Sequence, residues 1–239
     1  MTMKKTLHSV RFPGESRRYR HGRNELLLDE IKLRRQIEKV AGLRRELPLG
    51  GEIREDYVFE EGAPDLADRN AVRQVRMSSL FVPGKESLVL YSFMYGPQMQ
   101  HPCPMCTALL DSLDGSIPHA TQRINFAIVA KSPIQRIRDF ARQRGWANFR
   151  ILSSANNTYN HDYQGETAAG EQMPALNVFV PRGEKIFHFY NTELLFVDPE
   201  KDQNARHLDS LWPLWNLFDL TPEGRGTDWY PKLAYPSER

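Results

Sequence analysis

The sequence predicts an α/β fold in which helices flank a mixed β-sheet and a helical extension precedes it. Three observations support this. Short apolar segments alternate with helical patterns through most of the chain. One apolar segment leads directly into two cysteines and a helix, and two later segments flank a Pro-Arg-Gly turn. The 239 residues are 40% hydrophobic and 26% charged. This composition excludes a disordered chain, a collagen-like fibre and a coiled-coil rod.

The N-terminal part predicts an arm followed by an amphipathic helix. Residues 1–23 show no clear period. Asn24 is the expected N-cap, and apolar residues then recur at helical spacing from Leu26 to Leu47 before residues 48–51 stop the helix. We therefore expect residues 1–52 to form a basic arm and helix, and residues 53–239 to form the main domain. The apolar side of the helix suits either this domain or a second copy in a homodimer.

Charge is distributed unevenly along the chain. Residues 1–50 contain 13 Lys and Arg against 6 Asp and Glu, whereas the whole chain has a formal net charge of only +2. The basic residues of the helix are interpreted as a solvated face, with a patch for an acidic partner as the alternative. Nucleic acid is not an expected partner.

The main domain is predicted element by element. Strands are expected at residues 57–59, 79–82, 87–94, 124–130, 149–152, 175–180 and 185–190, and helices at about 103–113, 133–144 and 208–218. Ser132 is the expected N-cap of the second helix, and Gly145 is its expected stop. Parallel crossovers followed by an antiparallel hairpin and a closing helix are the order of a thioredoxin-like domain.

The chemistry is expected at the segment Cys103-Pro-Met-Cys106, which follows an apolar strand and opens a helix. The free N–H groups and positive dipole of a helix N-terminus stabilise a thiolate. Cys103 is thus the predicted nucleophile, and the more buried Cys106 resolves the mixed disulfide. A protonated His101, two residues upstream, would lower the thiol pKa further.

Two other interpretations of the cysteines remain open. A zinc site needs four ligands, and the sequence has no second Cys-x-x-Cys or His-x-x-His pattern. The cysteines are alternatively inert and buried. We expect neither a metal nor a cofactor.

A second feature accompanies the cysteines. Met173-Pro174 immediately precedes the strand expected at 175–180. In thioredoxin-like folds a cis proline at this point faces the cysteine pair, and its neighbouring backbone holds an extended substrate. We therefore predict that Met173 and Pro174, with His101, contact the substrate and that Pro174 is cis. A trans proline at the first residue of a strand is the alternative.

Several motifs together resemble the DUF899 family of bacterial thioredoxin-like proteins. They span most of the chain and are Glu30-Ile-Lys-Leu-Arg-Arg-Gln-Ile-Glu38, Arg44-Arg-Glu-Leu-Pro48, Asp56-Tyr-Val-Phe59, Tyr95-Gly-Pro97, Cys103-Pro-Met-Cys106, Arg144-Gly-Trp146, Ser153-Ser154, Asp162-Tyr163 and Asp219-Leu-Thr-Pro-Glu-Gly-Arg225. The resemblance implies a thioredoxin-like core with an N-terminal helical extension, and it leaves the substrate open. The tryptophan that precedes the cysteines in thioredoxin is absent here.

The sequence favours a thiol–disulfide oxidoreductase acting on a disulfide-bearing protein or a small thiol substrate, with a cellular thiol as reductant. One alternative is a peroxiredoxin-like peroxidase, although a Pro-x-x-x-Thr-x-x-Cys motif is absent. Another is a non-enzymatic binding module with structural cysteines. Two cysteines, no secretory h-region and no apolar run near the ~18 residues of a membrane span predict a cytoplasmic protein without membrane contact.

Overall fold

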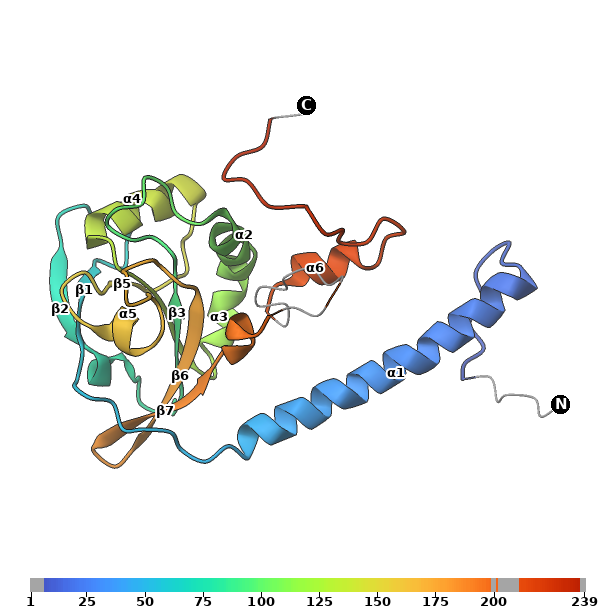
Figure 1. Ribbon diagram of the computed structural model, residues 1–239, viewed down its shortest axis with the longest axis horizontal. Helices are drawn as coiled ribbons and strands as arrows, with labels where there is room; N and C mark the ends of the chain where they lie inside the picture. Colours follow the sequence, from blue (N-terminus) through green and yellow to red (C-terminus); the bar gives the residue numbers. More distant parts are fainter. Residues whose placement is uncertain (1–6, 199–200, 202–210, 237–239) are drawn as a thin grey trace. The chain divides into compact units, whose positions relative to one another are not determined.

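The computed structural model describes residues 7–198, 201 and 211–236. The chain divides into two compact units, one up to Pro48 and one from Leu49 onward. The first unit contains helix α1 (Arg17–Arg45), and the second contains all the strands (Figure 1).

Helix α1 begins earlier than its apolar period suggests. Ser16 is the N-cap, and its hydroxyl oxygen accepts the N–H of Tyr19 at 3.1 Å. The prediction that Asn24 caps the helix is wrong, and so is the expected arm where it covers residues 17–23. A hydroxyl at the N-cap starts a helix without any apolar period, and arginine is itself a good helix former.

The second unit is built on a seven-stranded sheet with the order β2-β1-β5-β4-β3-β6-β7. Its elements are β1 (Val58–Gly62), β2 (Val72–Arg76), η1 (Met77–Leu80), β3 (Leu88–Ser92), α2 (Pro104–Leu113), η2 (Asp114–Ser116), α3 (Ile117–Ala120), β4 (Asn125–Ala130), α4 (Ile134–Arg144), β5 (Ile151–Ser153), α5 (Tyr159–Asp162), β6 (Ala175–Arg182), β7 (Lys185–Asn191), η3 (Glu193–Phe196) and α6 (Pro213–Phe218). Strands β3, β4 and β5 are parallel, and the remaining pairs are antiparallel. The predicted mixed sheet with flanking helices is confirmed.

Both faces of the sheet are covered. All five residues of β3 are buried, and they alternate between two cores. Val89 and Tyr91 face the core formed with α2, α4 and α6, whereas Leu88 and Leu90 face the core that includes α5 and η1. A strand that is buried on both faces has a continuous run of apolar residues. This run is why β3 could be predicted from the sequence.

Most predicted strands are confirmed, but the strand expected at residues 79–82 is wrong. Residues 79 and 80 lie in the 3₁₀ helix η1, and the strand is β2. Asp56 fixes this turn by accepting the N–H of Ser78 at 2.8 Å and its hydroxyl at 2.7 Å. Strand β2 pairs only with β1, and four of its five residues are exposed. Its sequence therefore carries no apolar alternation.

The later elements follow the predictions closely. Helix α4 ends at Gly145, which adopts φ +74° as a helix C-cap glycine does. It begins at Ile134 with Pro133 as N-cap, so the expected cap at Ser132 is wrong; the Ser132 hydroxyl instead donates to Gly96 O at 3.2 Å. The hairpin β6–β7 forms as predicted. Helix α6 begins at Pro213, and residues 208–210 of the predicted segment lie outside the described residues.

Candidate functional site

The cysteine segment lies where the central strand β3 leads into helix α2. The chain leaves the sheet after Ser92, and Cys103 returns to it by donating its N–H to Met94 O at 3.0 Å. Cys103 is the N-cap of α2, and Pro104, which has no N–H to leave unpaired, takes the first position. The predicted strand, loop and helix are therefore confirmed around the cysteines.

Arg136 of α4 holds the intervening loop in place. Its guanidinium donates to the carbonyl oxygens of Gly96, Pro97, Met99 and Gln100. It also lies 4.3 Å from the centre of the Tyr95 ring. One side chain thus satisfies several loop carbonyls, which rigidifies the approach to Cys103. The sequence analysis missed Arg136, because its role depends on contacts to residues far away in the chain.

The helix N-terminus acts on one sulfur only. Cys103 Sγ accepts the backbone N–H of Cys106 at 3.5 Å, and the Cys103 carbonyl oxygen accepts the Thr107 hydroxyl at 2.9 Å. Both cysteines are free thiols; Cys103 is half-buried and Cys106 is fully buried. The two cysteines lie one helical turn apart, but only Cys103 is accessible to another molecule.

Electrostatics separates the two thiols further. Hydrogen bonding by the Cys106 thiol, against the opposing effect of burial, lowers the pKa of Cys103 to about 6, with smaller contributions from backbone N–H groups and Tyr230. Burial raises the pKa of Cys106 well above its ordinary value. At neutral pH the site therefore contains a thiolate at Cys103 beside a protonated thiol at Cys106.

Two tyrosines flank the sulfurs. The Tyr230 hydroxyl lies 3.7 Å from Cys103 Sγ. Tyr91 of β3 is fully buried, and its pKa is raised by burial and then by Cys106. Neither Tyr230 nor Tyr91 is among the candidate site residues of the sequence analysis. Alternation along β3 places Tyr91 on the α2 face, so this tyrosine was accessible to pattern reasoning.

Met173 and Pro174 lie at the same edge of the sheet as the cysteine loop. Ala175 pairs with Ser92, so the preceding Pro174 lies next to the end of β3. Pro174 is buried, and Met173 donates its N–H to Gly165 O at 2.9 Å. The Met173–Pro174 bond is trans, as are the other peptide bonds of the described residues. The predicted cis proline is wrong, which agrees with the trans preference of about 0.5–1 kcal/mol for X–Pro bonds.

His101 is exposed, and it is not among the groups that shift the pKa of Cys103. Among the described residues, no three His, Cys, Asp or Glu side chains are grouped so as to hold a metal ion.

Two cavities lie near the strand edges. A groove of about 450 Å³ separates the cysteine loop from the segment before Met173; it is lined by Met94, Gly96, Pro97, Gln98, Met99 and residues 169–172. A cavity of about 610 Å³ is lined by residues that include Asn177 and His188. Asn177 belongs to the side of β6 that alternates away from Leu176 and the α2 core. Of these two cavities, the first borders the cysteine loop.

The chain combines a mixed sheet flanked by helices, in the order expected of a thioredoxin-like fold, with a Cys-x-x-Cys segment at the N-terminus of helix α2. The family model DUF899, described as a bacterial protein of unknown function, matches residues 9–236. The chain therefore belongs to the DUF899 family, as its motifs predicted. No curated protein matches the chain in sequence. In the described residues, no helix combines the length and apolarity required to cross a membrane.

Solved structures offer distant likenesses. The reduced 2-Cys peroxiredoxin of Plasmodium vivax is 14% identical, with a TM-score of 0.44 over 68% of this chain and 94% of its own. AhpC of Mycobacterium tuberculosis is 15% identical, with a TM-score of 0.43 over 73% and 93%. The thioredoxin lipoprotein Etrx1 of Streptococcus pneumoniae is 15% identical, with a TM-score of 0.37 over 54% and 84%.

Proposed function

We propose that this protein is a thiol–disulfide oxidoreductase in which Cys103 is the nucleophile and Cys106 the resolving thiol. The observation that carries the proposal is the contrast between the sulfurs. Cys103 Sγ accepts an N–H at a helix N-terminus, is accessible, and has a pKa lowered to about 6. Cys106 is buried and keeps its proton. A thiolate beside a protonated thiol is the pairing that stepwise disulfide exchange requires.

The reaction proceeds in two exchanges. The Cys103 thiolate attacks one sulfur of the substrate disulfide, which forms a mixed disulfide and releases the other sulfur as a thiolate that takes a proton from solvent. Cys106 then loses its proton and attacks Cys103 Sγ. This step forms the Cys103–Cys106 disulfide and releases the second substrate sulfur as a thiol. The substrate gains two electrons and two protons, and a thiol reductant returns the protein to its dithiol form.

The substrate is a disulfide-bearing protein or a small disulfide, and we place it along the groove beside the cysteine loop. The groove contains Met94 and Met99 on one side and residues 169–172 on the other. Thioether and apolar surfaces of this kind accommodate varied side chains. Met173, Pro174 and the exposed His101 are the proposed substrate contacts; Met173 directly follows the groove-lining residues 169–172, and because Pro174 is buried, its neighbouring backbone is the part proposed to meet the substrate.

Equilibration in buffers of graded thiol–disulfide potential tests the proposal. Free cysteines are alkylated and counted by intact mass. The expected result is one reversible two-electron transition that converts both thiols together. Single-cysteine variants, Cys103→Ser and Cys106→Ser, are the controls and are expected to show no such transition. The proposal is wrong if both thiols of the wild-type protein stay free across the range.

A second assay separates disulfide exchange from peroxide reduction. Wild-type protein is supplied with dithiothreitol and either oxidised glutathione or hydrogen peroxide. Disulfide reduction that depends on Cys103, with peroxide consumption no faster than in the Cys103→Ser variant, is the expected result. Cys103-dependent turnover of peroxide alone would instead identify the protein as a peroxidase.

A further inference from the structure

The C-terminal segment brings a third functional group to the cysteine site. Beyond α6 the chain doubles back toward α2 (Figure 1). There the Tyr230 hydroxyl comes within 3.7 Å of Cys103 Sγ, across 127 positions of sequence. When Cys103 is a thiolate its sulfur has no proton, so the phenol is the donor in this contact.

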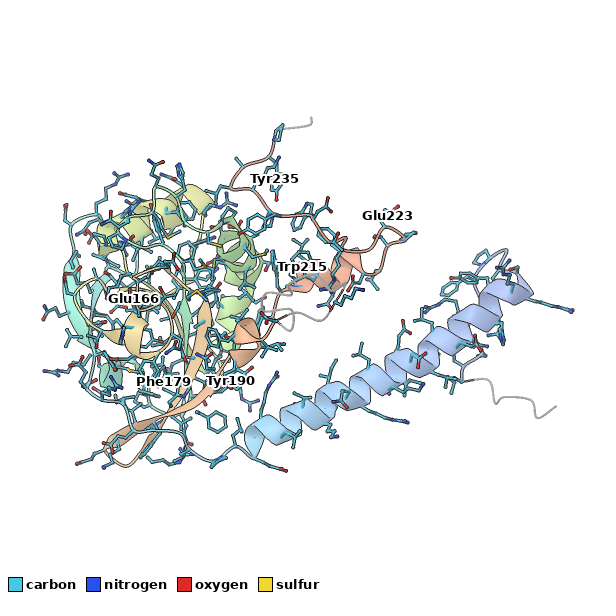
Figure 2. The ribbon with its side chains drawn as sticks, viewed as in Figure 1. Glu166, Phe179, Tyr190, Trp215, Glu223 and Tyr235 are labelled. Atoms are coloured by element: carbon cyan, nitrogen blue, oxygen red, sulfur yellow. The ribbon has the colours of Figure 1, made fainter. Side chains whose placement is uncertain are left out.

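Tyr230 is held from both sides. The neighbouring Trp229 ring packs edge-on against Trp215 of α6, with ring centres 5.6 Å apart, and against Phe218 at 5.0 Å. Trp215 is fully buried in the core that contains Cys106 (Figure 2 shows its position). Tyr230 is therefore anchored to the core through its neighbour.

The other side of Tyr230 is fixed by Arg144 of α4. Its guanidinium donates to Leu233 O at 2.7 Å and forms an ion pair with Asp111 of α2. Asp111 also accepts the indole N–H of Trp146 at 2.8 Å. The segment around Tyr230 is thus tied to both helices that flank the cysteines.

The environment of Tyr230 suits a hydrogen-bond donor. Burial and the neighbouring Cys103 raise the pKa of Tyr230, so the phenol keeps its proton at neutral pH. The residue is 52% exposed. Cys103 is itself only half-buried, so the contact with Tyr230 does not enclose the reacting sulfur.

We propose that Tyr230 is a catalytic residue that donates a hydrogen bond to the Cys103 thiolate and thereby stabilises the attacking form of the site. The catalytic role of Tyr230 rests on the proposed function. The hydrogen bond between Tyr230 and Cys103 does not depend on that function. When Cys103 enters a disulfide its sulfur loses the negative charge, and the bond from Tyr230 weakens. The phenol therefore stabilises the reduced thiolate over the oxidised state.

Three titratable groups act on Cys103, and each comes from a different part of the fold. They are Cys106 on α2, Tyr91 on β3 and Tyr230 on the C-terminal segment. Removing the Tyr230 hydroxyl alone leaves the helix N-terminus and Cys106 in place. The expected effect is therefore partial.

The test is the pH profile of Cys103 alkylation by iodoacetamide in the reduced protein, comparing wild type with Tyr230→Phe. The variant keeps the ring and loses the donor. We expect its midpoint to move to higher pH, so that alkylation at pH 6.5 slows about 3–10-fold, because a hydrogen bond to the charged form favours that form. The rates are expected to converge above pH 9, where Cys103 is ionised in both proteins. The absorbance of the thiolate near 240 nm gives the same midpoint independently.

Tyr235→Phe is the matched control. Tyr235 lies on the same segment, and its hydroxyl oxygen accepts the N–H of Lys232 at 3.2 Å. Its profile is expected to match wild type. A Tyr230→Phe profile that overlays wild type, or an equal shift in both variants, would overturn the proposal. Tyr230→Leu, which also removes the donor, serves as a second variant and is expected to give the same shift.

The alkylation assay keeps this inference separable from the proposed function. It needs neither a substrate disulfide nor turnover. A shifted profile together with no redox transition would retain the Tyr230 contact and reject the oxidoreductase. The reverse combination would retain the oxidoreductase and reject the role of Tyr230.

Discussion

One cysteine lies at the N-cap of α2 and the other lies in its first turn. Their sulfurs have opposite properties. Cys103 lies at the N-cap, accepts an N–H from the helix and contacts Tyr230. Cys106 lies inside the first turn and has no exposed surface. Hydrogen bonding and burial together decide which thiol ionises: the Cys106 thiol and, to a smaller extent, backbone N–H groups at the helix N-terminus stabilise the Cys103 thiolate, whereas burial keeps Cys106 protonated.

The largest expected effect comes from removing the sulfur of Cys103, the more accessible of the two cysteines. Cys103→Ser is expected to slow reaction with a disulfide such as dithionitrobenzoate by about 1,000-fold or more, since the remaining thiol is buried and protonated. The fold is expected to persist because Cys103 is half-buried at a loop end. Release of the coloured thiol measures the rate, and a thermal melt serves as the control. A variant as reactive as wild type would show that Cys106 is the nucleophile.

Removing the buried sulfur is expected to separate the two exchange steps. In Cys106→Ser the first attack stays within about threefold of wild type, because the serine hydroxyl still donates to Cys103 Sγ, but the mixed disulfide then accumulates. Intact mass after reaction with oxidised glutathione measures the trapped adduct. Cys106→Ala is the matched variant: it lacks the donor, so its alkylation midpoint is expected to rise above the wild-type value of about 6. Efficient turnover by Cys106→Ser would contradict the resolving role.

The depressed pKa of Cys103 has a consequence for stability. Because this pKa is about 6 in the folded protein and about 8.5 in an unfolded chain, the unfolded state binds more protons between these values. Stability from this group therefore increases as pH rises from 6 to 8.5, and it is lost as pH falls through 6. Relative to Cys103→Ser, the reduced wild-type protein is expected to gain about 2 kcal/mol between pH 6 and pH 8.

Urea unfolding under a phosphine reductant at several pH values measures this difference. Burial is the main reason that Cys106 stays protonated in the folded protein, and burial acts in both proteins, so Cys106 contributes little to the difference between pH 6 and pH 8. A constant difference across the range would mean that Cys103 is not a thiolate in the folded protein.

The smallest expected effect is that of replacing Tyr91, which acts on Cys106. Among the described residues, the buried Tyr91 hydroxyl has no hydrogen-bond partner, and its proximity to Cys106 favours ionisation of that thiol. Tyr91→Phe is expected to change the free energy of unfolding by less than about 1 kcal/mol, because no made hydrogen bond is lost. Resolution of the mixed disulfide is expected to slow about 2–5-fold. Stopped-flow measurement of the second step tests this, and faster resolution would assign Tyr91 the opposite role.

Local patterns in the sequence determined much of this protein. The continuous apolar run of β3, the two cysteines after it and the glycine that ends α4 each depend on neighbours within a few residues, so the sheet, the helix and the site were predictable. The start of α1 was missed because its cap, Ser16, precedes the apolar period. Strand β2 was missed because an exposed edge strand carries no alternation.

Only the tertiary structure decided which distant groups meet the cysteines. Arg136 holds loop carbonyls 36 to 40 positions away, and Tyr230 reaches Cys103 across 127. The tertiary structure likewise placed Pro174 beside the end of β3 with a trans bond. Such contacts depend on how strands and helices pack, and no periodic pattern in the sequence predicts them. The sequence by itself thus located the two cysteines and the helix that they open, whereas packing decided what surrounds their sulfurs.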